Sequence, residues 1–267
     1  MKKFICSLMG MFLVLGFSFA KEVYQSHEKR HSFEKRVEIS IDYWTIIPNG
    51  WFSFNGKKYD LREDFKLKNA KDFGGKIIYD GIERGFINII FTYTPIKFEG
   101  KGKSSTAFSI KSFNVNAGER YETIYDFNNY DLGFLWDVGH LKKKTEDRLD
   151  IRAGISARYL DGSLELKSDN GSEYKEDYNK IIPMLDVEAE VEVLPVHQNL
   201  TAEIILEYQG YAYNEEYMHD FIDALRINYI RGFIEGGYRI VKYKLKKNNI
   251  KTKTSGEGFF ISLGIMF

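Results

Sequence analysis

The stretch GFFISLGIMF (258–267) ends the chain and repeats with a period of two. A two-residue period is typical of a β-strand whose two faces differ. In water the apolar face of such a strand turns toward a protein core, whereas in lipid it turns outward. The rest of the sequence decides between these two solvents. The apolar face of this stretch comprises Phe259, Ile261, Leu263, Ile265 and Phe267.

The same alternation recurs along the chain and predicts an all-β protein. An even number of antiparallel up-and-down strands returns both ends of a closed barrel to the same side. Gly74, Gly75 and Gly81 interrupt the second strand, so eight strands remain the alternative to ten. The ten expected strands lie near residues 34–47, 73–83, 86–99, 118–138, 149–165, 176–193, 199–213, 217–230, 232–246 and 256–267.

The connections between these strands differ in length on the two sides. Longer polar segments follow the odd-numbered strands and include residues 48–72, 100–117 and 246–257. Most connections on the other side are short turns, although residues 139–148 form a longer one. Long external loops and short periplasmic turns are typical of bacterial outer-membrane barrels.

Aromatic residues on the apolar faces favour a membrane barrel. The alternative hypothesis is a water-soluble barrel with its apolar face inside. The aromatic residues sit near the expected strand ends, where a membrane barrel carries aromatic girdles at its two interfaces. Glycines such as Gly133 and Gly264 fall on the polar faces, where a narrow barrel needs small residues. The predicted girdle comprises Tyr43, Tyr93, Trp136, Tyr159, Tyr208, Tyr229 and Tyr238.

The free-energy cost of placing charged side chains in lipid determines which face of the strands contacts the bilayer. One face of residues 184–193 carries Asp186, Glu188, Glu190 and Glu192. An arginine facing lipid at the middle of a bilayer costs about 2–4 kcal/mol, and a carboxylate somewhat less. Because a folded domain is stable by only about 5–15 kcal/mol, four such acids cannot face lipid. The apolar faces are therefore expected to contact lipid, and the charged faces the interior.

The expected interior holds twelve acids against four arginines. We expect Arg152 and Arg158 to pair with acids of the strand near 176–193, and Arg226 with Glu203 or Glu207. A purely structural network of ion pairs is one explanation of these charges. The excess of acid makes a cation-selective lumen the alternative, although side chains should occlude much of so narrow a bore. The residues of this network are Glu38, Asp42, Asp131, Asp137, Asp150, Arg152, Arg158, Asp186, Glu188, Glu190, Glu192, Glu203, Glu207, Arg226, Glu235 and Arg239.

The N-terminus has the order of a secretory signal, with two lysines, an apolar stretch and a small-residue cleavage site. We expect a signal peptide at 1–20, a periplasmic lead at 21–33 and a barrel at 34–267. Cys6, the single cysteine, falls in the signal, so thiol chemistry is not expected. No later apolar run approaches the ~18 residues of a membrane helix, which leaves strands as the means of insertion.

Composition and motifs argue against several function classes. Without residues 1–20 the chain carries 36 basic and 38 acidic residues, which does not favour nucleic acid as a partner. No phosphate-binding glycine loop or zinc spacing occurs, and His27 and His31 lie in the polar lead. We therefore expect no cofactor, no metal and no catalytic residues. The one enzymatic alternative is a rim hydrolase built on His219 and Asp220, which are adjacent near the outer end of a strand.

Four stretches of the chain resemble a family of bacterial outer-membrane β-barrel proteins of unassigned function. They are YDLGFLWDV (130–138), DIRAGISARYLDG (150–162), PMLDVEAEVEVLP (183–195) and GGYRI (236–240). The resemblance implies a barrel in the outer membrane of a Gram-negative envelope and assigns no chemistry. A terminal Phe267 is similar to the signal by which such proteins are recognised by the barrel-assembly machinery, which would be a partner together with outer-membrane lipid.

These inferences predict an integral outer-membrane barrel, with a monomer favoured. Its role is expected to be structural, or that of a narrow path for solutes or ions. The alternative is surface adhesion or interaction through the external loops at 48–72 and 100–117.

Overall fold

The computed structural model describes residues 37–82, 87–138, 141–145, 148–197, 200–247 and 250–267. The predicted signal peptide (1–20) and periplasmic lead (21–33), with His27 and His31, lie outside the described residues.

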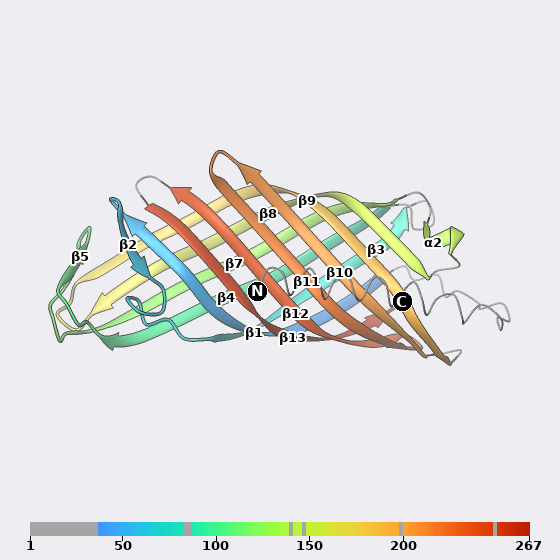
Figure 1. Ribbon diagram of the computed structural model, residues 1–267, viewed down its shortest axis with the longest axis horizontal. Coiled ribbons are helices and arrows are strands. Elements are labelled where there is room, and N and C mark those ends of the chain that lie inside the picture. The colour runs from blue at the N-terminus through green and yellow to red at the C-terminus, as the bar shows by residue number, and fades with distance from the viewer. Residues whose placement is uncertain (1–36, 83–86, 139–140, 146–147, 198–199, 248–249) are drawn as a thin grey trace, which may run out of the picture.

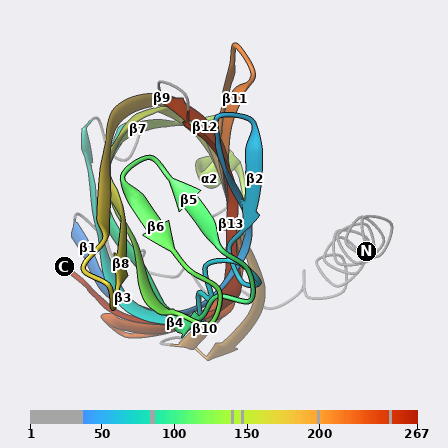
Figure 2. The same ribbon diagram turned by 90° about the vertical axis from the view of Figure 1, so that its left-hand side faces the viewer.

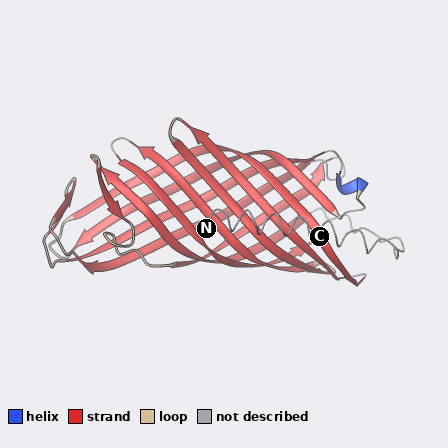
Figure 3. Cartoon of the chain, in the orientation of Figure 1, coloured by secondary structure: helices blue, strands red, loops and turns tan. Residues whose placement is uncertain are grey.

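Strands make up almost all of the described chain (Figures 1 and 3). The helix α2 (Leu141–Lys144) interrupts the connection at 139–148, and no helix in the described part is long and apolar enough to cross a membrane. The strands are β1 (Val37–Phe54), β2 (Lys57–Asp60), β3 (Ala70–Ile82), β4 (Ile87–Lys103), β5 (Phe108–Ile110), β6 (Phe113–Val115), β7 (Arg120–Asp137), β8 (Leu149–Ser168), β9 (Glu173–His197), β10 (Leu200–Tyr213), β11 (Glu216–Tyr229), β12 (Gly232–Lys247) and β13 (Ile250–Met266).

Ten of the described strands form a closed antiparallel barrel (Figure 2). Their order is β1-β3-β4-β7-β8-β9-β10-β11-β12-β13, and β13 pairs back onto β1 from Glu38↔Met266 to Phe54↔Ile250. The glycine-interrupted β3 pairs with β1 and with β4. The prediction of a ten-stranded up-and-down barrel is therefore confirmed, and the eight-stranded alternative is wrong.

The external connections are shorter than the sequence predicted. Residues 250–257, expected as part of a loop, continue β13 and pair with both β1 and β12. Thr252 and Thr254 point into the barrel, while Lys251 and Lys253 point out. The β10–β11 turn contains only Asn214 and Glu215, both at positive φ, as a tight hairpin turn requires. The two long connections contain β2, β5 and β6, so they are largely folded as β-structure.

An apolar band surrounds the end of the barrel at which β1 begins and β13 ends. Leu185 is 67% exposed, Leu263 61% and Phe259 75%, and all three point outward. Every backbone group of a closed barrel is paired within the sheet, so such a band is stable in hydrocarbon. This end, with its short turns, is the periplasmic and membrane-spanning part; the end with β2, β5 and β6 is external.

The polarity of the strands inverts above this band, as β9 illustrates. In its membrane-spanning part Leu185 and Val187 face outward, while Asp186 and Glu188 are buried inside. In its external part the inward residues become apolar and the outward ones polar; Tyr174, Tyr178 and Ile182 are buried, and Lys175, Asp177 and Asn179 are exposed.

The expectation of a charged interior along the whole barrel was therefore wrong for the external half. There the solvent outside is water, so the strands bury their apolar side chains as a water-soluble barrel does. The membrane-spanning half has the predicted inside-out arrangement, although some inward side chains are apolar, among them the cluster of Ile78, Ile90 and Leu135.

Candidate functional site

The bore of the external half is filled by a cluster of buried side chains that we call the upper core. Tyr125 of β7 lies 4.7 Å from Phe52 of β1, measured between ring centroids, and its hydroxyl lies 2.6 Å from that of Tyr243 on β12. Phe127 packs on Tyr243 at 5.2 Å. These strands lie on different sides of the barrel, so the aromatic rings meet across the bore.

A folded cap covers the upper core. The β5–β6 hairpin lies at the external mouth of the barrel (Figure 2) and buries Ile110, Phe113 and Val115 in the upper core. The Tyr59 hydroxyl of β2 donates to the Ser109 carbonyl at 3.3 Å. We use the name cap for β2, β5, β6 and the residues 55–69 and 104–119 around them.

Contacts with the barrel fix the cap in place. The Asn114 amide donates to Ser172 Oγ at 2.8 Å, and Lys111 pairs with Glu176 at 2.9 Å. Tyr121 donates its hydroxyl to the Asp64 carbonyl, and burial raises the pKa of Tyr121 to about 12. The cap is therefore a bound part of the barrel and not a set of free loops.

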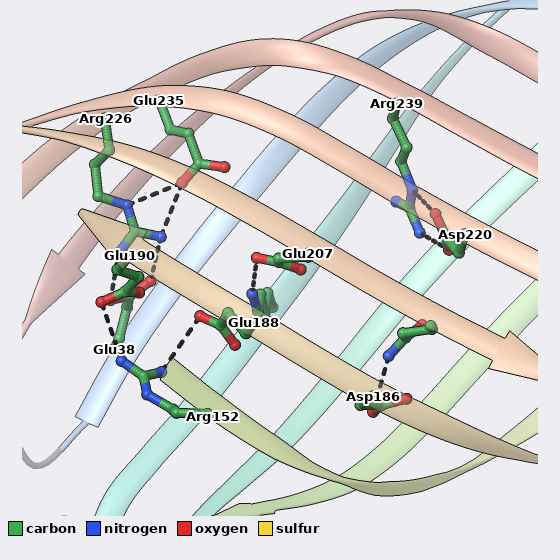
Figure 4. Close-up of polar contacts among 12 residues, drawn as sticks. Glu38, Arg152, Asp186, Glu188, Glu190, Glu207, Asp220, Arg226, Glu235 and Arg239 are labelled. Carbon is green, nitrogen blue, oxygen red and sulfur yellow. Dashed lines mark hydrogen bonds and ion pairs between the residues drawn. The ribbon is translucent and has the colours of Figure 1, made fainter. Parts of the chain in front are cut away.

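An ionic layer lies inside the barrel at the height where its polarity inverts. Arg158 is fully buried, and its guanidinium donates to both oxygens of Asp131 at 2.6 and 2.7 Å. It also reaches across the bore to Asp220 at 2.9 Å. Arg239 donates to both oxygens of the same Asp220, at 3.0 and 2.7 Å (Figure 4). Two arginines and two aspartates thus form one chain of paired charges.

Three further ion-pair clusters line the membrane-spanning half (Figure 4). Arg152 contacts Asp150, Glu188 and Glu190 at 2.6, 3.3 and 3.0 Å. Arg226 contacts Glu38 at 3.0 Å and Glu235 at 2.8 Å, and Lys76 contacts Glu207 at 2.6 Å. These pairs offset the mutual repulsion of the acids inside a narrow bore.

The expected pairings hold for Arg152 but not for the other two arginines. Arg158 reaches β7 and β11 instead of the acids of β9. Arg226 contacts β1 and β12 instead of Glu203 or Glu207. Contacts across a bore depend on the stagger of the strands, which the alternation of one strand does not reveal.

A small polar cavity of about 50 Å³ lies between these clusters. Its lining includes Ser40, Asp42, Lys76, Glu207 and Ser262. A water needs about 10–15 Å³ of such volume, so the cavity has room for only a few waters. Groups of three or more metal-ligating side chains are absent from the part of the chain that the structure describes.

The predicted girdle residues fall into two rings on the outer surface. Tyr43, Tyr93, Tyr159, Tyr208 and Tyr238 lie toward the external edge of the apolar band, and Trp136 and Tyr229 lie toward the periplasmic edge. Tyr130 joins the external ring, since its ring centroid lies 5.0 Å from that of Tyr93 and 6.2 Å from that of Tyr159. Tyr130 was missed although it shares the parity of Leu132 and Trp136.

The structure does not bring His219 and Asp220 together as a catalytic pair. Consecutive residues of a strand point to opposite faces. Asp220 is buried in the ionic layer, whereas His219 lies outside, where Tyr208 Oη is 2.7 Å from its Nδ1. The sequence prediction placed Asp220 at the rim and did not include Lys76. Asp220 has the same parity along β11 as Ala224 and Arg226, and this parity could have placed Asp220 in the interior.

The last strand shows what Phe267 and the glycines do. The Phe267 amide donates to the Val37 carbonyl at 2.9 Å, so the final residue helps to close the barrel. A Cβ added to Gly264 would lie 2.1 Å from the ring of Phe233, so only glycine leaves space for that ring inside.

A closed barrel of an even number of antiparallel strands, with an outward apolar band between two aromatic rings, is the architecture of bacterial outer-membrane proteins. The chain is an outer-membrane β-barrel. Its place is the bacterial outer membrane, as the sequence predicted.

The outer-membrane β-barrel also resembles solved structures in its fold. Ail, the attachment invasion locus protein of Yersinia pestis, solved in complex with the heparin analogue sucrose octasulfate, is 12% identical, with a TM-score of 0.40 over 88% of this chain and 100% of that one. The outer membrane protease OmpT of Escherichia coli is 11% identical, with a TM-score of 0.44 over 91% and 99%. The transport unit of the Escherichia coli autotransporter AIDA-I is 10% identical, with a TM-score of 0.43 over 94% and 96%.

No protein-family model matches the chain, and no curated protein matches it in sequence.

Proposed function

We propose that this outer-membrane barrel is a sealed scaffold that holds its cap at the cell surface as a platform for interaction with other molecules. The membrane-spanning half anchors the protein, and the external half supports the cap. In this role the ion pairs of the lumen are structural.

The observation that carries the proposal is the upper core. Phe52, Phe98, Tyr125 and Phe127 are buried in the bore and come from β1, β4 and β7. A water or ion crossing this level would have to displace buried aromatic rings that pack against one another. Such a core stabilises a barrel and hinders the passive movement of solutes or ions through its bore.

The fixed cap supports the part of the proposal that concerns interaction. A rigid surface loses less conformational entropy on binding than free loops do. The contacts of Lys111 with β9 and of Asn114 with the turn between β8 and β9 hold the hairpin before any partner arrives. Exposed residues of the cap, such as Ser109, Ser112 and Asn116, are left to face outward.

Single-channel recording in planar bilayers tests the sealed bore. We expect the refolded protein to give no steady conductance, because the upper core blocks the bore. The triple variant Phe52→Ala, Tyr125→Ala, Tyr243→Ala removes the rings that meet across the bore, and we expect it to conduct. Steady conductance of the unmodified protein at the level of the triple variant would refute the sealed scaffold.

A cation path is the second candidate, and the polar cavity among excess acids favours it. It requires the upper core to move aside, so it predicts voltage- or ligand-dependent conductance with cation preference in the unmodified protein. The same recordings therefore separate the two candidates.

Replacement of residues 105–117 by a short Gly-Ser linker tests the platform. We expect the variant to remain folded and non-conducting, since the aromatic rings of β7 and β12 lie below the hairpin, while adhesion of cells displaying the protein to host-cell or bacterial surfaces is lost. Unchanged adhesion relative to cells displaying the intact barrel would contradict a role of the cap.

A further inference from the structure

Five lysines form a ladder on the outer surface of the external half. Lys242, Lys244 and Lys246 alternate along β12, and Lys251 and Lys253 alternate along β13. The residues between them, such as Tyr243 and Thr252, are buried, so all five side chains point outward. We call this set the lysine ladder.

The strand register places these lysines directly opposite one another. Lys244 pairs with Lys253, and Lys246 pairs with Lys251. Like charges directly opposite on neighbouring strands destabilise a sheet. Two such pairs in succession cost stability that a bound anion would offset.

The opposite side of the same external half has a different charge pattern. There each of the outward lysines Lys97, Lys101, Lys167 and Lys175 has a carboxylate within 4 Å, provided by Glu99, Glu122 or Glu165. No lysine of the ladder has an ion pair with another described residue of the chain. The carboxylate of Glu216 is already held by Lys180 and by the Lys246 amide. Four outward lysines on that side therefore have a nearby carboxylate partner, whereas the ladder lysines have none among the described residues. Lys103, at the end of β4 and directly opposite Arg120, is an exception on that side.

The position of the lysine ladder along the barrel axis, relative to the membrane, limits what can bind there. Tyr238 belongs to the external aromatic ring, and its ring centroid lies 5.1 Å from that of Phe259 in the apolar band. Lys242 follows Tyr238 by four residues on the same face. At about 3.3 Å per residue this is roughly 13 Å along a tilted strand. The ladder therefore begins where the headgroups of the outer leaflet lie.

Aromatic and basic groups extend the surface toward β1 and β2. Trp51 is directly opposite Lys253, and Lys58 lies over the Trp51 ring at 4.6 Å from its centroid. Glu257 stands at the lower edge of the patch, where Asn49 donates to it at 3.4 Å. Above Glu257, the charged side chains that point outward from β12 and β13 are the five lysines of the ladder.

We propose that the lysine ladder binds the phosphate-bearing headgroup of an outer-leaflet glycolipid. Several ammonium groups in a row match several phosphates on one sugar headgroup, and each contact is a charge-assisted hydrogen bond. The acyl chains of the same lipid would pack on the apolar band below. The site goes beyond the proposed platform and is independent of whether the bore is sealed.

Binding of rough lipopolysaccharide to the full barrel in phosphatidylcholine nanodiscs tests the proposal. The ladder variant carries Lys244→Gln, Lys246→Gln, Lys251→Gln and Lys253→Gln. We expect its affinity to be roughly 10- to 100-fold weaker, because each surface lysine contributes to the attraction of an anionic headgroup. The matched control carries Lys97→Gln, Lys101→Gln, Lys167→Gln and Lys175→Gln, and we expect it to bind within about threefold of the unmodified protein.

Further arms of the experiment identify the ligand chemistry. Lipopolysaccharide treated with phosphatase is expected to lose affinity for the unmodified barrel, and inorganic phosphate is expected not to compete at equal concentration. Equal losses in the ladder variant and the control would overturn the proposal, since they would reflect net charge alone. Full competition by inorganic phosphate would also overturn it by showing a site for a free anion. Heat-modifiable migration of both variants checks that they are folded.

Discussion

Replacement of Arg158 by Ala is expected to destabilise the folded barrel by about 3–5 kcal/mol, because it leaves buried carboxylates without their partner. Arg158 makes bidentate contacts with Asp131 and bridges to Asp220, and none of these side chains is reached by bulk water. The measurement is a urea titration of the refolded protein in detergent micelles, followed by tryptophan fluorescence.

A surface pair and a rescue variant control this result. Lys175 also pairs with a carboxylate, Glu165, at 2.9 Å, but it is exposed, so Lys175→Ala should change the stability by no more than about 1 kcal/mol. The double variant Arg158→Met, Asp131→Leu replaces a charged pair by apolar side chains and should recover much of the loss. If Arg158→Ala costs no more than Lys175→Ala, the ionic layer is not a buried network.

The variant Phe127→Ala is expected to cost about 3–5 kcal/mol, because it opens a cavity in the upper core. Phe127 is fully buried inside the bore and packs on Tyr125 at 4.3 Å and on Tyr243 at 5.2 Å. Nearby rings on different strands cannot collapse freely into the space. The same urea titration measures the loss.

Phe259 provides a matched control, because it is the same residue type on the outer face of the barrel. It is 75% exposed on the protein surface, where lipid can fill the space of a lost ring. Phe259→Ala should therefore lose only the transfer free energy, about 2 kcal/mol, without a cavity term. A cost of Phe127→Ala no greater than that of Phe259→Ala would mean that the external bore holds water.

The period of two along each strand was sufficient to predict the barrel. Residues 184–193 alternate apolar and acidic side chains without a break, and an acidic face cannot be turned to lipid at tolerable cost. Parity then placed residues such as Glu188, Arg152 and Arg226 inside, where the structure has them. Glycines weaken the alternation of apolar and polar residues in β3, so the inward position of Lys76 was not predicted. The ion pair that Lys76 forms in the lumen was therefore not predicted either.

Alternation alone could not reveal where the surroundings change from lipid to water. The inward residues of β9 pass from Glu188 to Tyr178 without any change in backbone period. The apolar side chains of the external part were therefore easily assigned to loops, as happened at residues 48–72. The same limit applies to Thr252 and Thr254, whose polar side chains lie inside the barrel, with their hydroxyl oxygens 2.8 Å apart.

Pairing across the bore was the least predictable feature of the interior. Asp220 and Arg158 are 62 residues apart and meet only because the stagger of ten strands brings them to one height. A sequence gives the face on which each side chain lies, but the stagger follows from the closure of the whole barrel. The upper core and the ionic layer could therefore be found only in the folded structure.

Spin labels at single cysteines along the outer face of β9 test the inversion of polarity most directly, and Cys6 can be replaced by Ser to give a cysteine-free background. Labels at Asp177 and Asn179 should be relaxed by a water-soluble nickel complex, and labels at Leu185 and Val187 by oxygen dissolved in the bilayer. The change between the two is predicted near Ile181. A uniform response along all four positions, or greater access to the nickel complex at Leu185 than at Asp177, would contradict the account.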